Sequence, residues 1–316
     1  MIKQIATSGV MVLAMMALTR IPAAAEIDLA GQWAGRYHED WPERFGPGPD
    51  VADYTGLPLN DAARAKADGW EASVQTLQER QCIPHPFPYS LRGPATMRIW
   101  SETDPVSGHT IDWKMYGTFG RATHTVWMDG RPHPSENAPH TWEGFTTGWW
   151  DGDGLSTYTT HIKMGYLRRN GVPTSDLATV SEHWTRHGNT LTATVIVYDP
   201  VYLTEPYIRT SNWQLDPTLP PILPTPCEPV VEVARPKGAV PHYLPGQNPF
   251  LNEFPKMYNI PLEAARGGSE TMYPEYRRKL RGGYVAPEKC TRYCCGGGPV
   301  GPGVLNCSSS DNRETH

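Results

Sequence analysis

Hydrophobic and polar residues alternate with a period of two in short runs between about residues 95 and 215. The runs are rich in Thr, Val, Ile, Trp and Tyr, which is typical of β-strands with one buried face. Short turns such as DGDG (151–154) and HGN (187–189) separate them, so consecutive strands are expected to be antiparallel. The predicted strands are MRIW (97–100), HTIDWKMYG (109–117), ATHTVWMDG (122–130), GFTTGWW (144–150), LSTYTTHIKM (155–164), ATVSEHWTRHG (178–188), TLTATVIVYD (190–199) and IRTSNWQLD (208–216).

This pattern predicts a mainly β fold, an antiparallel barrel or sandwich built as a meander. LAGQWAGRYH (29–38) adds a first strand, and its Gly-X-Trp at Gly31–Trp33 resembles the start of lipocalin-type barrels. In those barrels the Trp closes one end. Between the first strand and the others, Asn60 is a good N-cap for a helix over 61–75.

The rest of the chain divides by composition. Residues 216–276 hold many prolines and little periodicity, so we expect an ordered arm that wraps the barrel, with a short helix near Asn252–Tyr258. Residues 277–316 end in Gly- and Ser-rich stretches and are predicted to be a flexible tail. The predicted units are 1–25, 26–94, 95–215, 216–276 and 277–316.

The first 25 residues are typical of a secretory signal peptide. Lys3 precedes an apolar run from Ile5 to Leu18, and the small residues Ala23–Ala25 suit signal peptidase. Cleavage is predicted after Ala25, which places the mature protein in the periplasm or outside the cell. No later run has the roughly 18 apolar residues of a transmembrane helix, so no membrane insertion is expected.

Composition narrows the function classes further. Removing 25 of the 316 residues leaves 291, and the loss of Lys3 and Arg20 takes the formal charge from −5 to −7. There is no basic stripe, and nucleic-acid binding is therefore not expected. The 30 Gly and 32 Pro favour a turn-rich β architecture.

Six cysteines follow the signal peptide, and an oxidising compartment allows them to pair. Cys82 and Cys227 are isolated, and a disulfide between them is the leading prediction, with two free buried thiols as the alternative. The other four lie in the tail, in a CxxxCC pattern followed by GGG that matches no familiar zinc-binding spacing.

Several strings resemble a large family of exported bacterial proteins of unknown function. They include GRPHP (130–134), RRNGVPTSD (168–176), SEHWTRH (181–187) and YDPVYLTEP (198–206). The similarity extends from about Asp28 to Tyr276, and it implies a shared fold without implying an activity. The tail after about Arg281 does not resemble the family, and is either a lineage-specific extension or a frameshifted reading.

Strand parity places a carboxylate on a buried face. In residues 178–188, Glu182 and Arg186 share the face of Val180 and Trp184, which is expected to be the core or lumen side. Charges buried together must pair or they destabilise the fold. Glu182 and Arg186 are therefore either a structural ion pair or the polar floor of a site in which burial tunes the pKa of Glu182.

A loop rich in charged and amide side chains follows the strand at 155–164. Arg169, Asn170 and Asp176 lie in it, and His161 ends the strand on the face of the inward threonines. One interpretation is a loop held by its own hydrogen bonds, with Asp176 gripping Arg169. The other is the mouth of a pocket that binds a polar or anionic group.

The segment WMDGRPHPSENAPHTWEGFTTGWWDGDG (127–154) is dense in Trp and His. Its tryptophans are expected mainly to pack the core or lumen. His133 and His140 lie on a long Pro-bracketed loop, and loops of that length are often functional. A metal site would need converging His and carboxylate ligands, and neither HxH nor HxxxH occurs in this segment, so no metal or other cofactor is predicted.

Three function hypotheses follow. The first is a binding protein for a small hydrophobic or aromatic molecule held in a β-barrel pocket. Its contact residues would be Trp127, Trp142, Arg169, Asn170, Trp184 and Arg186. The second is a cofactor-independent hydratase, isomerase or lyase, because no nucleophile motif such as GxSxG or SxxK occurs. Its acid/base residues would be Glu182, His161, His140 and Asp176. The third is a structural or interaction protein that uses the Pro-rich arm.

Overall fold

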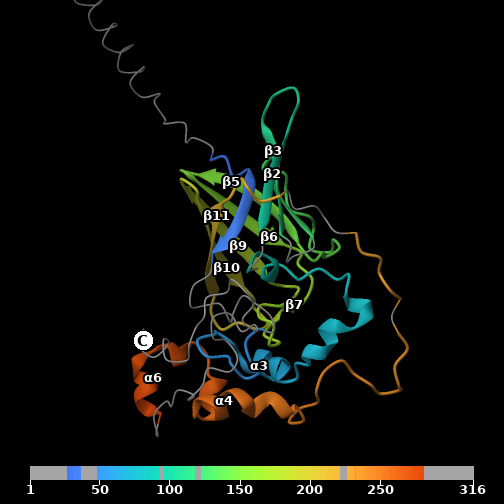
Figure 1. Ribbon diagram of the computed structural model, residues 1–316, viewed down its shortest axis with the longest axis vertical. Helices are drawn as coiled ribbons and strands as arrows, with labels where there is room; N and C mark the ends of the chain where they lie inside the picture. Colours follow the sequence, from blue (N-terminus) through green and yellow to red (C-terminus); the bar gives the residue numbers. More distant parts are fainter. Residues whose placement is uncertain are drawn as a thin grey trace, which may run out of the picture.

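In the computed structural model of the chain, nine strands form one closed barrel, and their side chains point alternately inward and outward (Figure 1). The structure describes residues 27–36, 48–92, 96–117, 122–220, 226–231 and 233–280. In order around the ring, the strands are β1 (Gly31–Arg36), β11 (Tyr207–Leu215), β10 (Thr190–Tyr198), β9 (Thr179–His187), β6 (Gly154–Thr160), β5 (Phe145–Asp151), β4 (Thr123–Trp127), β3 (Thr110–Gly117) and β2 (Met97–Thr103). Because β2 pairs again with β1, the ring is closed, and the predicted mainly β fold with a barrel is confirmed.

The barrel departs from a simple meander at two places. β6 pairs with β9, and the chain between them leaves the ring to form the two-residue strands β7 (Gly165–Tyr166) and β8 (Pro173–Thr174). β4 and β5 run parallel, whereas the other neighbours in the ring are antiparallel. The connection between β4 and β5 must therefore travel the length of the barrel, which explains the long loop in residues 128–144.

Aromatic side chains fill the barrel at the end where β1 begins. Trp33 is fully buried and donates from Nε1 to the carbonyl of Leu29 (2.9 Å). The rings of Trp184 and Trp213 stack at 5.6 Å between centroids. The guanidinium of Arg186 lies 5.3 Å from the centre of the Trp33 ring. The Gly-X-Trp at the start of the barrel thus supplies a buried ring at this end, as the resemblance to lipocalin-type barrels implies.

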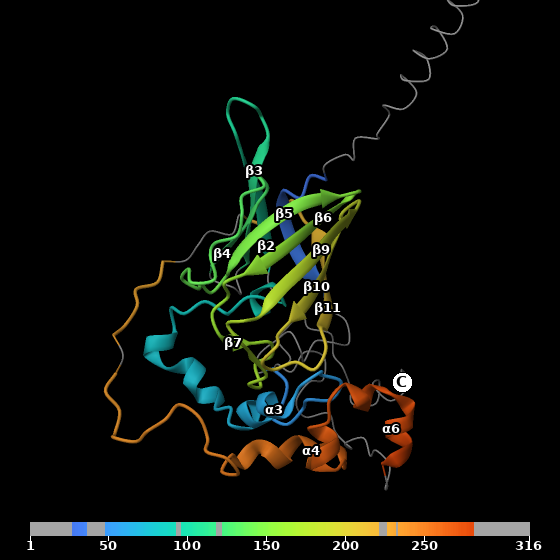
Figure 2. The ribbon, with the colours of Figure 1, turned by 180° about the vertical axis from the view of Figure 1, so that it is seen from behind.

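Short helices form a cap below the opposite end of the barrel (Figures 1 and 2). α3 (Asp61–Asp68) begins as predicted at Asn60, whose side chain accepts from the amide of Ala63 at 2.9 Å. α3 is shorter than predicted because the chain turns at Gly69 and continues as 3-10 turns. The other helices are α4 (Glu253–Tyr258), which the sequence predicts, α5 (Leu262–Ala265) and α6 (Pro274–Lys279), with 3-10 turns at Ala72–Thr76, Gln78–Arg80, Tyr89–Arg92, Pro249–Asn252 and Ser269–Met272.

The Pro-rich arm is attached to this cap. A disulfide joins Cys82 and Cys227 with their Cα atoms 5.6 Å apart, which confirms the predicted pairing. Further along the arm, Arg235 forms an ion pair with Glu79, and the amide of Tyr243 donates to the carbonyl of Gly69 at 2.9 Å. The contacts therefore hold the arm against the cap.

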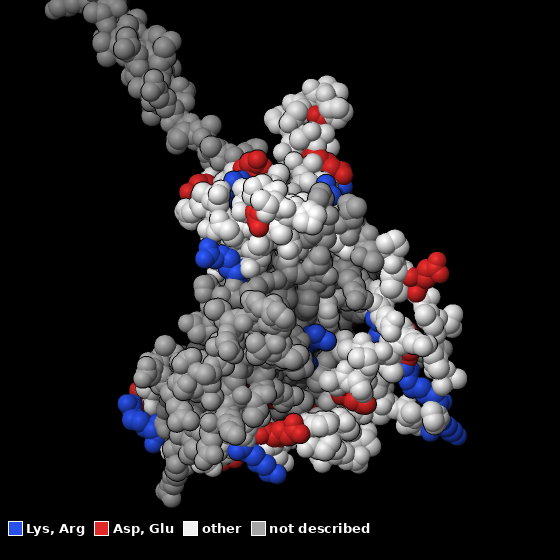
Figure 3. Space-filling view, viewed as in Figure 1, with Lys and Arg blue, Asp and Glu red and all other residues white. Residues whose placement is uncertain are grey.

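The segment predicted to be a signal peptide and the tail cysteines lie outside the described residues. Within the described part of the chain, no helix has the length and apolar character needed to cross a membrane. On the face shown in Figure 3, Lys and Arg are scattered among Asp and Glu.

We expect Cys82→Ser to lower the free energy of unfolding by about 2–5 kcal/mol, because the disulfide closes a long loop of the unfolded chain. Urea unfolding under oxidising conditions measures this loss. Cys307→Ser, in the tail, is the control for removal of a thiol. Equal stability of Cys82→Ser and the wild type, or two free thiols in a non-reducing peptide map, would contradict the assignment.

Candidate functional site

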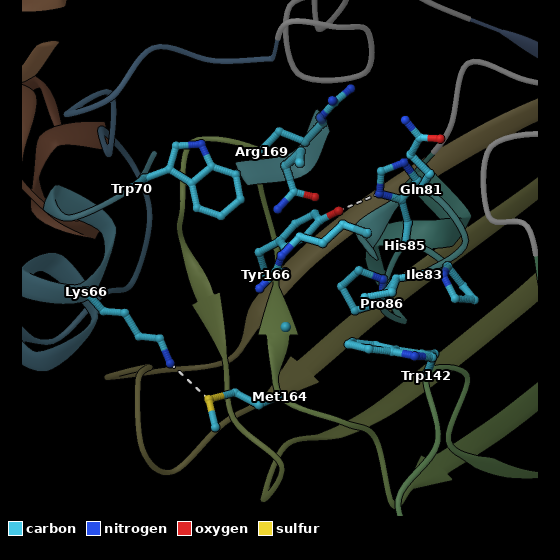
Figure 4. A pocket seen from close by; sticks show the side chains of 14 residues that line it. Lys66, Trp70, Gln81, Ile83, His85, Pro86, Trp142, Met164, Tyr166 and Arg169 are labelled. Carbon is cyan, nitrogen blue, oxygen red and sulfur yellow. Dashed lines mark hydrogen bonds between the residues drawn. The ribbon is translucent and has the colours of Figure 1, made fainter. Parts of the chain in front are cut away.

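A cavity of about 530 Å³ lies between the barrel and the cap (Figure 4). We call it the cap pocket. Its walls come from α3 and the turns that follow it, from the Pro-rich loop at 83–86, from Trp142 before β5, and from β7. The lining side chains include Lys66, Trp70, Arg80, His85, Trp142, Met164, Tyr166 and Arg169. The volume suits a small organic molecule.

Tyr166 is at the centre of the aromatic part of the cap pocket. Its ring meets Trp70 edge to face at 5.6 Å between centroids, and meets Tyr89 at 4.9 Å. Its hydroxyl lies 2.5 Å from Nδ1 of His85, the contact drawn in Figure 4. These contacts fix the ring and give the pocket a polar group beside its aromatic wall.

Trp70 can pack beside Tyr166 because residue 171 is a glycine. The glycine has a φ of 89°, and a Cβ atom there would lie 2.5 Å from Cβ of Trp70. A larger residue would therefore push Trp70 out of place as well as strain the backbone. The NG turn in RRNGVP thus supports the Trp70 wall of the pocket from behind.

The cap pocket carries positive charge. Lys66, Arg80 and Arg169 line it, and no Asp or Glu is among its described lining residues. Lys66 is held in place because its Nζ donates to Sδ of Met164 at 2.9 Å and to the hydroxyl of Tyr202 at 3.1 Å. The whole chain has a formal charge of −5, yet every charged residue described in the lining of this cavity is a cation. Such a cavity favours an anionic ligand.

A second cavity of about 580 Å³ adjoins the cap pocket and shares Lys66, Trp70, Arg80 and Tyr166 with it. Its far wall is the Pro-rich arm, including His242, Tyr243 and Pro245. The arm therefore encloses space beside the cap pocket. The disulfide that anchors the arm also holds this wall of the second cavity in place.

The predicted contact residues divide between this site and the framework. Trp142 and Arg169 line the cap pocket. Asn170 is buried and donates to the carbonyls of Asp50 (2.9 Å) and Asp53 (3.1 Å), which ties the loop to the segment before α3. Asp176 is exposed, and no hydrogen bond between described residues joins it to Arg169. Hydrogen bonds to the chain before α3 thus hold this loop.

His161 does not lie on the lumen face, and that expectation is wrong. β6 ends at Thr160, and His161 has a φ of 57°, which turns its side chain out of the strand pattern. Its Nδ1 contacts Oγ1 of Thr160 at 2.7 Å and its Nε2 contacts the carbonyl of Ser135 at 2.8 Å. His140 similarly contacts the carbonyl of Ile162 at 2.9 Å. Both histidines fasten the β4–β5 connection to the barrel.

His133 has the same fastening role. Its ring nitrogens contact Oγ1 of Thr160 at 2.7 Å and Oγ1 of Thr147 at 2.9 Å. Trp127, at the end of β4, carries the guanidinium of Arg131 over its ring at 3.5 Å. The dense polar and aromatic segment at 127–154 is therefore largely the attachment of one long connection to the outer surface of the barrel.

Glu182 points into the barrel with Val180 and Trp184, as strand parity predicts. The predicted ion pair with Arg186 is wrong, because Arg186 donates instead to the carbonyls of Asp28 and Gly188. Glu182 Oε2 accepts from Oγ1 of Thr157 at 2.8 Å. The indole N–H of Trp184 lies 3.4 Å from the same oxygen.

The partner that faces Glu182 is His124, a pairing that the sequence does not predict. Nε2 of His124 lies 4.0 Å from Oε2 of Glu182, and Nδ1 lies 3.5 Å from Oε2 of Glu143. Phe87 stacks on the imidazole at 4.4 Å with the ring planes 4° apart. Glu143 precedes β5, and His124 begins the inward face of β4, so only the parallel pairing of these strands brings them together.

Burial and charge act in opposite directions in this group. Burial raises the pKa of Glu182, and the neighbouring His124 opposes the rise. For His124, burial alone would lower the pKa, but Glu143 and Glu182 together raise it above its usual value. The two carboxylates lie on opposite ring nitrogens, and within the described residues no three His, Cys, Asp or Glu side chains converge as metal ligands.

No protein-family model matches the chain, and no curated protein is significantly similar to it. The chemistry of the cap pocket and of the buried group must therefore carry any functional conclusion.

We expect Glu182→Gln to lower the pKa of His124, because the imidazolium loses a carboxylate 4.0 Å from Nε2. NMR titration of the His124 ring protons measures the shift. His133, on the outer surface, provides the internal control, since its titration should not move. A pKa of His124 that is the same in both proteins would show that the two side chains are not coupled.

Proposed function

We propose that the protein binds a small aromatic anion in the cap pocket. The observation that carries this proposal is the composition of the wall, in which the rings of Trp70, Trp142 and Tyr166 occur with three cations and no described carboxylate. Aromatic walls favour a planar apolar body, and cationic side chains favour a carboxylate or a similar group. Besides the rings and the cations, the pocket has two neutral polar groups, the His85 ring and the Tyr166 hydroxyl, which would orient the ligand.

The position of the pocket differs from the binding hypothesis based on the sequence. A lumen site was expected, with Trp184 as a contact, but Trp184 is fully buried in packing against Trp213. The cap pocket lies instead at the end of the barrel, between loops and the cap. The barrel thus acts as the rigid support of the site.

The disulfide supports a location outside the cytoplasm. Disulfides persist in oxidising compartments, and the Cys82–Cys227 bridge joins the loop of the cap pocket to the arm that encloses the adjoining cavity. We infer that the protein is exported and holds its ligand in that compartment.

We expect the protein to bind trans-cinnamate more tightly than the neutral isostere cinnamamide, because only the carboxylate can pair with the pocket cations. Arg80→Gln is expected to weaken cinnamate binding about tenfold or more, since a hydrogen bond to a charged group contributes about 1.5–3 kcal/mol. Binding of cinnamamide should change little. Isothermal titration calorimetry measures both affinities.

The matched control is Arg278→Gln, an exposed arginine on α6 that is absent from the described lining of the pocket. It should leave both affinities unchanged. Equal affinity for the acid and the amide in the wild type would contradict the anionic preference. Absence of binding to both compounds would contradict the proposed class of ligand.

A further inference from the structure

The polar group inside the barrel is only partly satisfied. Glu182 Oε2 has its donors, but Glu182 Oε1, Glu143 Oε1 and both ring nitrogens of His124 have no hydrogen-bond partner among the described residues. Glu182 and His124 are nearly completely buried. A group that served only to hold the core together would use these atoms in hydrogen bonds, since unpaired buried polar atoms destabilise a fold.

Beside this group, two neighbouring strands of the barrel wall share few paired residues. β4 and β5 are paired only at Val126–Thr146 and Trp127–Thr147, whereas the antiparallel neighbours are paired over longer stretches. Below these pairs the two strands are no longer joined by the ladder. A cavity of about 300 Å³ lies at this seam, which we call the seam pocket.

Glu143 connects the seam pocket to the buried group. It lines the pocket, and its side chain is 11% exposed, compared with 3% for His124 behind it. It is the one charged residue among the described lining, which otherwise consists of small and polar residues and the rings of Trp127, Trp142 and Phe145. The seam pocket is thus an aromatic-walled space with a single carboxylate at its inner side.

His124 and then Glu182 lie behind that carboxylate. The imidazole lies between the two carboxylates, 3.5 Å from Glu143 on one nitrogen and 4.0 Å from Glu182 on the other. The imidazole therefore connects the carboxylate at the pocket with the carboxylate in the core. Phe87, stacked on the ring, fixes its orientation. A carboxylate at the wall of a pocket with an imidazole behind it is an arrangement suited to general acid/base chemistry.

We propose that Glu143 is the proton-transfer residue of a second site, which takes a neutral planar conjugated molecule bearing an acidic C–H bond. Glu143 takes the proton from one carbon and returns it to another carbon of the same molecule, so atoms and charge balance without a co-reactant. His124 and Glu182 are positioning residues. The seam pocket shares Pro84 and Trp142 with the cap pocket, but its one charged lining residue is a carboxylate, whereas the cations of the cap pocket favour an anion.

The probe for this site is 5-nitrobenzisoxazole, a neutral planar compound opened by one proton abstraction. The base takes the ring C–H proton, the electron pair forms the nitrile, the N–O bond breaks and a coloured phenolate leaves. The proton then passes from Glu143 to water. Absorbance of the phenolate gives the rate with the full mature chain.

We expect Glu143→Gln to reduce kcat/KM for the probe about 100-fold, the lower end of what a positioned general base contributes. Glu136→Gln, an exposed residue in the same β4–β5 connection, should react at the wild-type rate. Glu182→Gln should keep the reaction but displace its pH profile, an effect that loss of stability alone would not produce.

Thr125→Trp tests the same proposal without altering the buried group. Thr125 lines the seam pocket from β4, and a Trp side chain there would fill the pocket and stop the reaction. Thr194→Trp, on the partly exposed face of β10, is the matched control and should react normally. A wild-type rate no greater than that of Glu143→Gln or Thr125→Trp, including no rate at all, would overturn the proposal.

Discussion

Closure of the nine strands into one ring is the constraint on which the rest of the structure depends. A closed ring leaves no free sheet edge among its strands, and it forces each strand to place alternate residues inside or outside. The tryptophans at one end fill the interior, and strand parity places His124 of β4 and Glu182 of β9 on the inner face. The ring has few backbone pairings at one place, because the parallel strands β4 and β5 are paired at only two positions.

Much of the fold is readable from local pattern. Alternation identifies each strand of the barrel, though not the short β7 and β8 outside it. It also places Glu182 and Trp184 on the inner face because side-chain parity is a local property. The same rule fails at His161, and at Arg186 the predicted ion pair with Glu182 is wrong although the side chain lies over the buried Trp33 ring. A left-handed backbone at His161 ends the alternation, and Arg186 lies near the barrel end, where the carbonyl of Asp28 replaces the expected carboxylate partner. Neither a strand end nor a backbone partner has a clear signal in one sequence.

The candidate sites are less predictable because they are assembled from distant segments. The cap pocket combines Lys66 and Trp70 from the cap, His85 from a Pro-rich loop and Tyr166 from the excursion between β6 and β9. None of these segments has a motif, and only Trp142 and Arg169 are identified from the sequence. His124 has no sequence feature that separates it from other histidines, and its role depends on the parallel pairing that brings Glu143 beside it. The disulfide is predictable because only two cysteines precede the tail cluster.

The barrel, the cap and the arm have separate roles in this account. The barrel is the rigid support, the cap supplies cations and rings, and the disulfide holds the arm across the adjoining cavity. We propose above that the cap pocket holds a small aromatic anion. Native mass spectrometry of the protein, purified without added ligand from its own host, can detect such a ligand. We expect a bound small acid in the wild type and none in Arg80→Gln. The mass of the polypeptide alone in the wild type would contradict the proposal.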